Sequence, residues 1–249
     1  MRTFPTVSMS AHVLRFKWEI DNARRELKRR GLSSASTWWQ DTLRCVGVGN
    51  RVKIGDHRKS WDVLKTAAFL EERVSESAPI LDIGAFASEL VCVLHRLGFT
   101  NLVGVDVDPH VRLMPFARDI RYEVANFMET PFEQESFQAI TAISVIEHGF
   151  KGEALLAEVS RLLRPGGYFI ASFDYWPQKV DTTGVLLFGM DWRIFSREEV
   201  LQFVEEARAY GLTPAGDVDL QAQEAPIAYA ERDYTFAWIV LQKSMGGPR

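Results

Sequence analysis

The sequence predicts an α/β fold in which a doubly wound, mostly parallel sheet follows a helical N-terminal cap. From Pro79 onward, short apolar runs alternate with amphipathic helical patterns, as expected for parallel strands covered by helices on both faces. Several of these runs end in a glycine or an acidic residue, which is typical of ligand-binding strand ends. The first 75 residues instead show helical spacing without strand alternation.

Length and composition restrict the classes of protein to consider. With 249 residues, of which 47% are apolar and 25% charged, the chain fits one α/β domain with an extension. The formal net charge of -4 disfavours binding to nucleic-acid phosphates. No apolar run has the length of a membrane span or a signal-peptide core, so we expect a cytoplasmic protein without a membrane partner. Cys45 and Cys92 lack metal-site spacing and predict no disulfide framework.

Residues 1–75 are expected to form a helical cap that serves as a substrate lid. An apolar spacing begins at Leu14 and the following polar run ends at Gly31, a plausible C-cap. Trp38 and Trp39 lie in the next loop. A second helix is predicted over 60–74, with Trp61, Leu64 and Ala68 on one side. The basic residues from Arg24 to Arg30 are interpreted as a solvated helix face in preference to a binding patch.

The remaining chain alternates strands and helices. Strands are predicted at 80–83, 102–105, 122–124, 139–144, 168–173, near Val218 and at 234–241, and helices at 90–97, 154–163 and 196–211. Ser196 and Glu199 form a capping box at the start of the last helix. The connection after Asp106 contains Pro109 and Pro115 and is expected to be partly irregular.

Three strand ends carry the candidate binding residues. Gly84 follows the strand 80–83 and permits a tight turn, and Ser88 is a candidate N-cap for the next helix. Asp106 comes 22 residues after Gly84, where a carboxylate can accept two hydrogen bonds from ribose hydroxyls. Asn126 follows the third strand. Each feature alone has a plain structural explanation, as a turn or a helix cap, but their order and spacing together favour a nucleoside site.

A wider set of motifs carries a family resemblance: 80–84 (ILDIG), 103–106 (VGVD), 131–137 (PFEQESF), 143–148 (ISVIEH) and 162–167 (LLRPGG). With these motifs the chain resembles a class I S-adenosylmethionine-dependent methyltransferase with a type 11-like methyltransferase domain. The resemblance implies that this domain covers 76–249. It also implies a seven-stranded, Rossmann-like sheet whose last strand, 234–241, is antiparallel.

The resemblance also implies roles for individual residues. Those expected to bind the cofactor, S-adenosyl-L-methionine, are Asp82, Gly84 and Ala85 (methionine part), Asp106 (ribose), Val107, Asn126 and Phe127 (adenine) and Ser144 (near the methionine carbons). His148 is the candidate base, with the alternative that it only shapes the pocket. Glu147 would contact the cofactor or orient His148. No metal is implied.

The sequence departs from the family pattern in the glycine-rich loop. Phe86 and Ser88 stand where further glycines are usual, and a phenylalanine does not freely adopt positive φ. This departure leaves a non-catalytic binding or scaffold protein as the alternative function. A nicotinamide-dependent oxidoreductase is disfavoured because Gly-x-Gly-x-x-Gly is absent after the first strand.

The acceptor is expected to be a small molecule, such as a sugar or another metabolite hydroxyl, that enters between the cap and the segment 174–193. That segment contains aromatic and acidic residues, which suit a polar ring or an amine and equally serve as packing anchors. His57 lies in a polar loop where it could line the entrance, but no role is assigned to it. A homodimer is left open.

Overall fold

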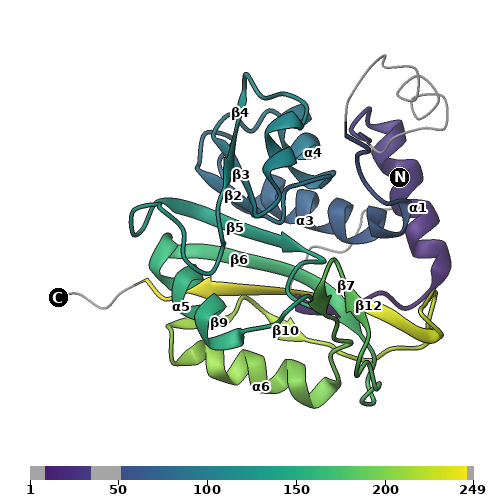
Figure 1. The fold of residues 1–249 in the computed structure, drawn as a ribbon. Coiled ribbons are helices and arrows are strands. Elements are labelled where there is room, and N and C mark those ends of the chain that lie inside the picture. The colour runs from purple at the N-terminus through teal and green to yellow at the C-terminus, as the bar shows by residue number, and fades with distance from the viewer. Residues whose placement is uncertain (1–8, 35–51, 246–249) are drawn as a thin grey trace.

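The computed structural model describes residues 9–34 and 52–245. Trp38, Trp39 and Cys45, which were considered in the sequence, lie outside these residues. A central mixed sheet crosses the molecule, with α1, α3 and α4 on one face and α5 and α6 on the other (Figure 1). The doubly wound α/β prediction is therefore confirmed.

The helices are α1 (Lys17–Arg29), α3 (Ser60–Arg73), α4 (Leu90–Arg96), α5 (Gly152–Leu162) and α6 (Arg197–Arg208), with short 3₁₀ helices η1 (His57–Lys59) and η2 (Pro109–Leu113). The strands are β1 (Met9–Val13), β2 (Ile80–Ile83), β3 (Leu102–Asp106), β4 (Ile120–Val124), β5 (Phe137–Ile143), β6 (Leu163–Tyr175), β7 (Leu186–Leu187), β8 (Met190–Asp191), β9 (Leu212–Pro214), β10 (Asp217–Val218), β11 (Ile227–Tyr229) and β12 (Arg232–Lys243).

The sheet order is β10-β1-β12-β6-β5-β2-β3-β4, with β9 and β11 also paired to β12. The five adjacent strands β4, β3, β2, β5 and β6 run parallel to one another. The next strand, β12, runs antiparallel to β6, as expected for the last strand. The edge beyond β12 differs from the prediction because β1, within the expected helical cap, pairs with β12. Its five residues, MSAHV, are too few for alternation to be recognised against the neighbouring helix.

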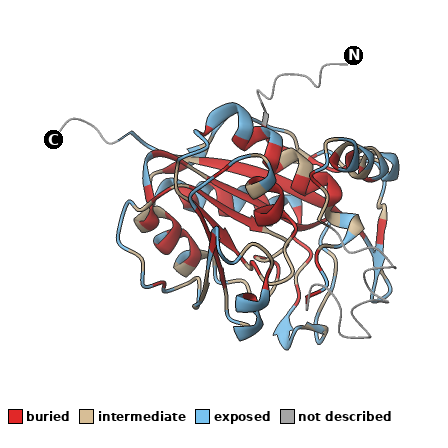
Figure 2. Ribbon diagram, turned by 90° about the horizontal axis from the view of Figure 1, so that it is seen from above, coloured by how far each residue is buried: buried red, intermediate tan, exposed pale blue. Residues whose placement is uncertain are grey.

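The alternating side chains of the strands supply two hydrophobic cores, one on each face of the sheet. On β2, Ile80 belongs to the core under α1, α3 and α4, whereas Leu81 and Ile83 belong to the core under α5 and α6. On β12, Trp238 and Ile239 divide in the same way. Buried residues accordingly fill the interior of the sheet and the inner sides of the helices (Figure 2).

Two local details differ from the sequence predictions. The helix α3 has the predicted bounds to within a residue, but Ala68 is exposed, and Trp61, Phe69 and Leu70 form its buried side. The N-cap of α4 is Glu89 instead of Ser88. The Ser88 hydroxyl still accepts a hydrogen bond from Leu90 N (3.3 Å). In both cases packing against the sheet, rather than the local pattern, sets the final phase of the helix.

Candidate active site

The strand order reverses at β2, which lies between β3 and β5. In an open parallel sheet the connections on either side of such a point run in opposite directions and leave a crevice at the carboxyl ends of the strands. The loops after β2, β3 and β5 carry Gly84, Asp106 and Ser144. The tertiary fold therefore brings three segments predicted from sequence to the same edge of the sheet.

Gly84 makes the turn that follows β2. Its φ is +71°, and its N–H, like that of Ala85, donates to Val105 O (2.9 and 3.0 Å). A Cβ on Gly84 would lie less than 3.0 Å from Cγ2 of Val145, so glycine is required by the conformation and by the close approach of the loop after β5.

The loop accommodates Phe86 by placing its strain at the next residue. Ala87 has φ +61°, whereas Phe86 keeps an ordinary negative φ and its half-buried ring packs against the core under α4. An alanine in the left-handed region costs about 1–2 kcal/mol. Phe86 therefore does not prevent the loop from closing around the end of β2.

The Asp106 carboxylate is held by the backbone of two loops. Oδ2 accepts a hydrogen bond from Phe86 N (3.0 Å) and Oδ1 accepts one from Asp108 N (2.9 Å). Each carboxylate oxygen can accept a further hydrogen bond, and the side chain is only half-buried. The neighbouring Val107 is 58% exposed, so an apolar surface lies open beside the carboxylate.

Asp82 is an internal carboxyl group. It is buried and accepts hydrogen bonds from Ser88 Oγ (2.9 Å) and Thr141 Oγ1 (2.7 Å). Burial raises its pKa to about 7, against which the two hydroxyl donors act. In this structure Asp82 ties the loop after β2 to β5, so its predicted contact with the methionine part of a cofactor stays a prediction.

The residues expected around adenine and the methionine carbons lie in two further loops. Asn126 is exposed and its Oδ1 accepts a hydrogen bond from Met128 N (3.1 Å), while Phe127 is half-buried. Ser144 has φ +54°, and its Oγ is buried without a hydrogen-bond partner in the described structure. A buried hydroxyl without a partner is unfavourable, which makes Ser144 Oγ available to a ligand.

A group of buried carboxyl side chains lies on the other side of this crevice. Glu147 follows β5, Asp174 lies near the carboxyl end of β6 and Asp62 lies on α3, and each is at most 4% exposed. The Lys59 ammonium lies 3.5 Å from Asp174 Oδ1 and over the ring of Phe236, 3.4 Å from its centroid. Burial raises the pKa of Glu147 well above its ordinary value, with Asp174 adding to the effect and Lys59 opposing it. Glu147 is thus held toward its neutral form.

His148 is placed beside this acidic group by the loop after β5. Its ring meets Phe188 edge-on with centroids 5.3 Å apart, and its backbone pairs with Trp192. Burial lowers the pKa of His148, an effect that the Asp174 charge opposes, so the neutral imidazole is favoured. Its Nδ1 is buried without a partner in the described residues.

The segment 174–193 contains both packing anchors and site residues. Tyr175 is buried and its hydroxyl donates to Leu220 O (2.7 Å). Trp192 Nε1 donates to Asp174 Oδ2 (2.7 Å) and therefore orients the buried carboxylate. Asp181 and Asp191 are exposed.

The sequence did not predict that Lys59, Asp62 and Asp174 lie together in the site beside Glu147. Asp174 could have been found, because it is the first acidic residue after an apolar strand, the criterion that selected Asp106. Asp62 and Lys59 carry no such signal, since polar residues near a helix start are ordinary. They belong to the site only because α3 packs across the sheet.

Comparison with known proteins relates the chain to methyltransferases. Residues 81–171 match the family described as methyltransferase domain. Sterol methyltransferase-like 3 of Botryococcus braunii is 31% identical over 127 residues, which are 45% of this chain and 32% of that protein. The chain spans about a third of the length of the curated relatives it matches.

Solved structures share the fold at low identity. The [4+2]-cyclase SpnF has a TM-score of 0.56 and 15% identity, covering 80% of this chain and 85% of its own. Geranyl diphosphate C-methyltransferase from Streptomyces coelicolor A3(2) has a TM-score of 0.55 and 18% identity, covering 76% and 86%. In the described part of the chain, no helix combines the length and apolar character required to cross a bilayer. Nor do His, Cys, Asp or Glu gather there in threes as metal ligands would.

Proposed function

We propose that this chain, whose residues 81–171 match the methyltransferase domain family, transfers a methyl group from S-adenosylmethionine to a small-molecule acceptor. One observation carries the proposal. The glycine turn after β2 and the carboxylate after β3 are joined by the hydrogen bond from Phe86 N to Asp106 Oδ2 at the point where the strand order reverses. This arrangement can hold a nucleoside at the carboxyl ends of parallel strands.

The residues of the crevice fit the cofactor. The Asp106 oxygens retain lone pairs for two ribose hydroxyls, Val107 offers an apolar surface to adenine, and Ser144 Oγ is a buried group that still lacks a partner. Asn126 and the Phe127 N–H would contact the rim of the adenine ring. When bound, S-adenosylmethionine supplies a methyl group already activated on a sulfonium.

The protein would then contribute mainly alignment and, for a hydroxyl acceptor, a base. Aligning nucleophile, methyl carbon and sulfur contributes about 7–11 kcal/mol, and a base about 10²–10⁴ in rate. Neutral His148 is suited to take a proton from a hydroxyl, and neutral Glu147 can donate a hydrogen bond to the acceptor. A sugar or another metabolite hydroxyl is the acceptor that we propose for this pair.

A non-catalytic binding protein is the second candidate. A shared fold does not by itself determine whether a protein catalyses a reaction. The feature that first favoured this candidate, Phe86, supports it less because Ala87 takes the strained conformation in its place.

Calorimetry of the full chain with S-adenosylmethionine tests the proposal. We expect Asp106→Ala to weaken binding at least tenfold, because both ribose hydrogen bonds and the loop contact are removed. Asp119→Asn is the matched control, since that carboxylate is 61% exposed and lies outside the crevice. Turnover is followed as S-adenosylhomocysteine formed with a panel of hydroxyl acceptors. Absence of cofactor binding at millimolar concentration would refute the proposal.

A further inference from the structure

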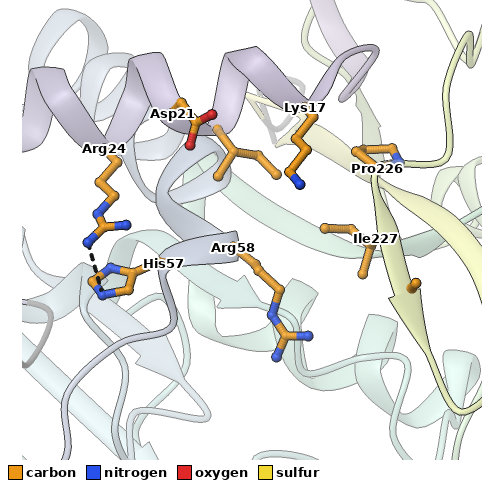
Figure 3. A pocket seen from close by; sticks show the side chains of 9 residues that line it. Lys17, Asp21, Arg24, His57, Arg58, Pro226 and Ile227 are labelled. Carbon is orange, nitrogen blue, oxygen red and sulfur yellow. Dashed lines mark hydrogen bonds between the residues drawn. The ribbon is translucent and has the colours of Figure 1, made fainter. Parts of the chain in front are cut away.

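A cavity of about 320 Å³ lies between α1, η1 and β11, apart from the crevice at the strand ends (Figure 3). It is lined by Lys17, Ile20, Asp21, Arg24, His57, Arg58, Pro226, Ile227 and Ala228. Lys17 and Arg24 come from α1, whereas His57 and Arg58 come from η1. The volume lies at the small end of the range for small-molecule sites.

The cavity carries an excess of positive charge. Lys17, Arg24 and Arg58 are cationic, and Asp21 is the single acidic residue of the lining. Arg58 already binds Asp56 (2.6 Å). Neither Lys17 nor Arg24 has a carboxylate partner in the part of the chain that the structure describes. Positive charge therefore exceeds negative charge in this lining, although Asp21 offsets part of it.

Two hydrogen-bond donors at the cavity also lack acceptors. Arg24 Nη2 lies 3.3 Å from His57 Nε2, and because a guanidinium only donates, Nε2 accepts and the imidazole proton resides on Nδ1. Burial and the Arg24 charge lower the pKa of His57, which agrees with a neutral ring. Within 9–34 and 52–245, His57 Nδ1 and Arg24 Nε are both buried without a partner.

We propose that this cavity binds a phosphoryl group, as a phosphate monoester or diphosphate, carried by the acceptor substrate. A doubly charged group matches the two unpaired cations better than a carboxylate does, and hydrogen bonds from cationic groups to phosphate are stronger than those between neutral groups. Ile20, Pro226 and Ile227 give an organic body of the ligand an apolar wall.

The link between this cavity and the acceptor substrate follows from the position of η1 and rests on the proposed function. Arg58 of this short helix lines the cavity, while the next residue, Lys59, lies 3.5 Å from Asp174 in the acidic group beside His148. A ligand held by its phosphoryl group in the cavity would thus lie next to the place where methyl transfer is proposed.

Titration calorimetry of the full chain with inorganic phosphate, glucose 1-phosphate and glucose tests the inference. We expect both phosphates to bind and glucose not to bind, with Arg24→Ala weakening phosphate binding at least tenfold. Arg25→Ala is the matched control, because Arg25 is exposed on the same helix and bonds to Asn22. Lys17→Ala, at an exposed position, should also weaken phosphate binding, and this second test does not depend on the folding of the Arg24 variant.

The two sources of the phosphoryl group are distinguished by affinity. Glucose 1-phosphate binding at least tenfold more tightly than inorganic phosphate supports an organic phosphate acceptor, and equal affinities overturn the link to the acceptor. Absence of phosphate binding, or an equal loss in Arg24→Ala and Arg25→Ala, overturns the site. S-adenosylmethionine is titrated into the same samples. Phosphate binding without cofactor binding would refute the proposed function and leave the anion site standing.

Discussion

Replacing Gly84 by alanine tests the geometry of the turn after β2 most directly. The new Cβ would lie less than 3.0 Å from Val145 Cγ2 and 3.3 Å from Cγ1, on a backbone with φ +71°. The left-handed conformation costs a non-glycine residue about 1–2 kcal/mol, and overpacking costs about 1–3 kcal/mol more. We therefore expect the free energy of unfolding to fall by about 2–5 kcal/mol.

Gly31→Ala separates these two costs. Gly31 has φ +70°, nearly that of Gly84, but a Cβ there meets no atom within 4 Å. Its replacement should cost only the conformational part, about 1–2 kcal/mol. For a chain of this size, 1 kcal/mol corresponds to roughly 2–4 °C in Tm, so the variants should differ measurably in thermal unfolding.

Val145→Ala supplies the second half of a double-mutant cycle. Without its Cγ atoms, the nearest Val145 atom to the new Cβ is 3.4 Å away, an ordinary van der Waals contact. In the Val145→Ala background, Gly84→Ala should cost only about 1–2 kcal/mol. The assay is chemical denaturation of the four variants, together with cofactor calorimetry on those that fold. An identical cost of Gly84→Ala in both backgrounds would refute the proposed contact between the two loops.

Three further predictions follow from single side chains. Burial raises the folded pKa of Asp82 to about 7 from 3.8, so its contribution to stability, on the order of 4 kcal/mol, is lost as pH rises between these values. Asp82→Asn should flatten the dependence of stability on pH between pH 4 and 7 in denaturant titrations, and an unchanged dependence would contradict the assignment. Thr66→Val removes the acceptor of the buried Trp238 Nε1 donor (2.9 Å) and should lower the free energy of unfolding by about 1–3 kcal/mol. Thr66→Ser, which keeps the hydroxyl, should lower it less, and equal losses would show that the hydrogen bond is not responsible. The lowered pKa of His148 predicts that kcat/KM falls with decreasing pH, with a midpoint below 6.5. His148→Ala should remove this pH dependence and reduce turnover about 10²–10⁴-fold. A loss of less than about tenfold would exclude His148 as the base.

Local patterns in the sequence were sufficient for the parallel half of the sheet. The runs ending at Gly84 and Asp106 are short and mainly apolar, as expected for strands that are buried on both faces. The capping box of Ser196 and Glu199 formed as predicted, because its hydrogen bonds join residues three apart. Such features depend on neighbours in the chain, which the sequence displays directly.

The outer edge of the sheet was not predictable in this way. The strand β1 was missed because its pairing with β12 joins residues more than 220 positions apart, as in Ala11 with Ile239. Neither segment contains a local signal of the other. The phase of α3 was likewise set by the sheet beneath it, which left Ala68 exposed.

The sequence alone determined the strands of the parallel half of the sheet, the glycine turn and the carboxylate that follows the next strand, since each arises from a short stretch of chain. Only the tertiary structure placed Lys59 and Asp62 beside Glu147 and Asp174, and only it joined Arg24 to His57 around a basic cavity. The physical reason is that burial and charge depend on which distant segments pack together. The same residues, read along the chain, are ordinary polar positions near helix ends.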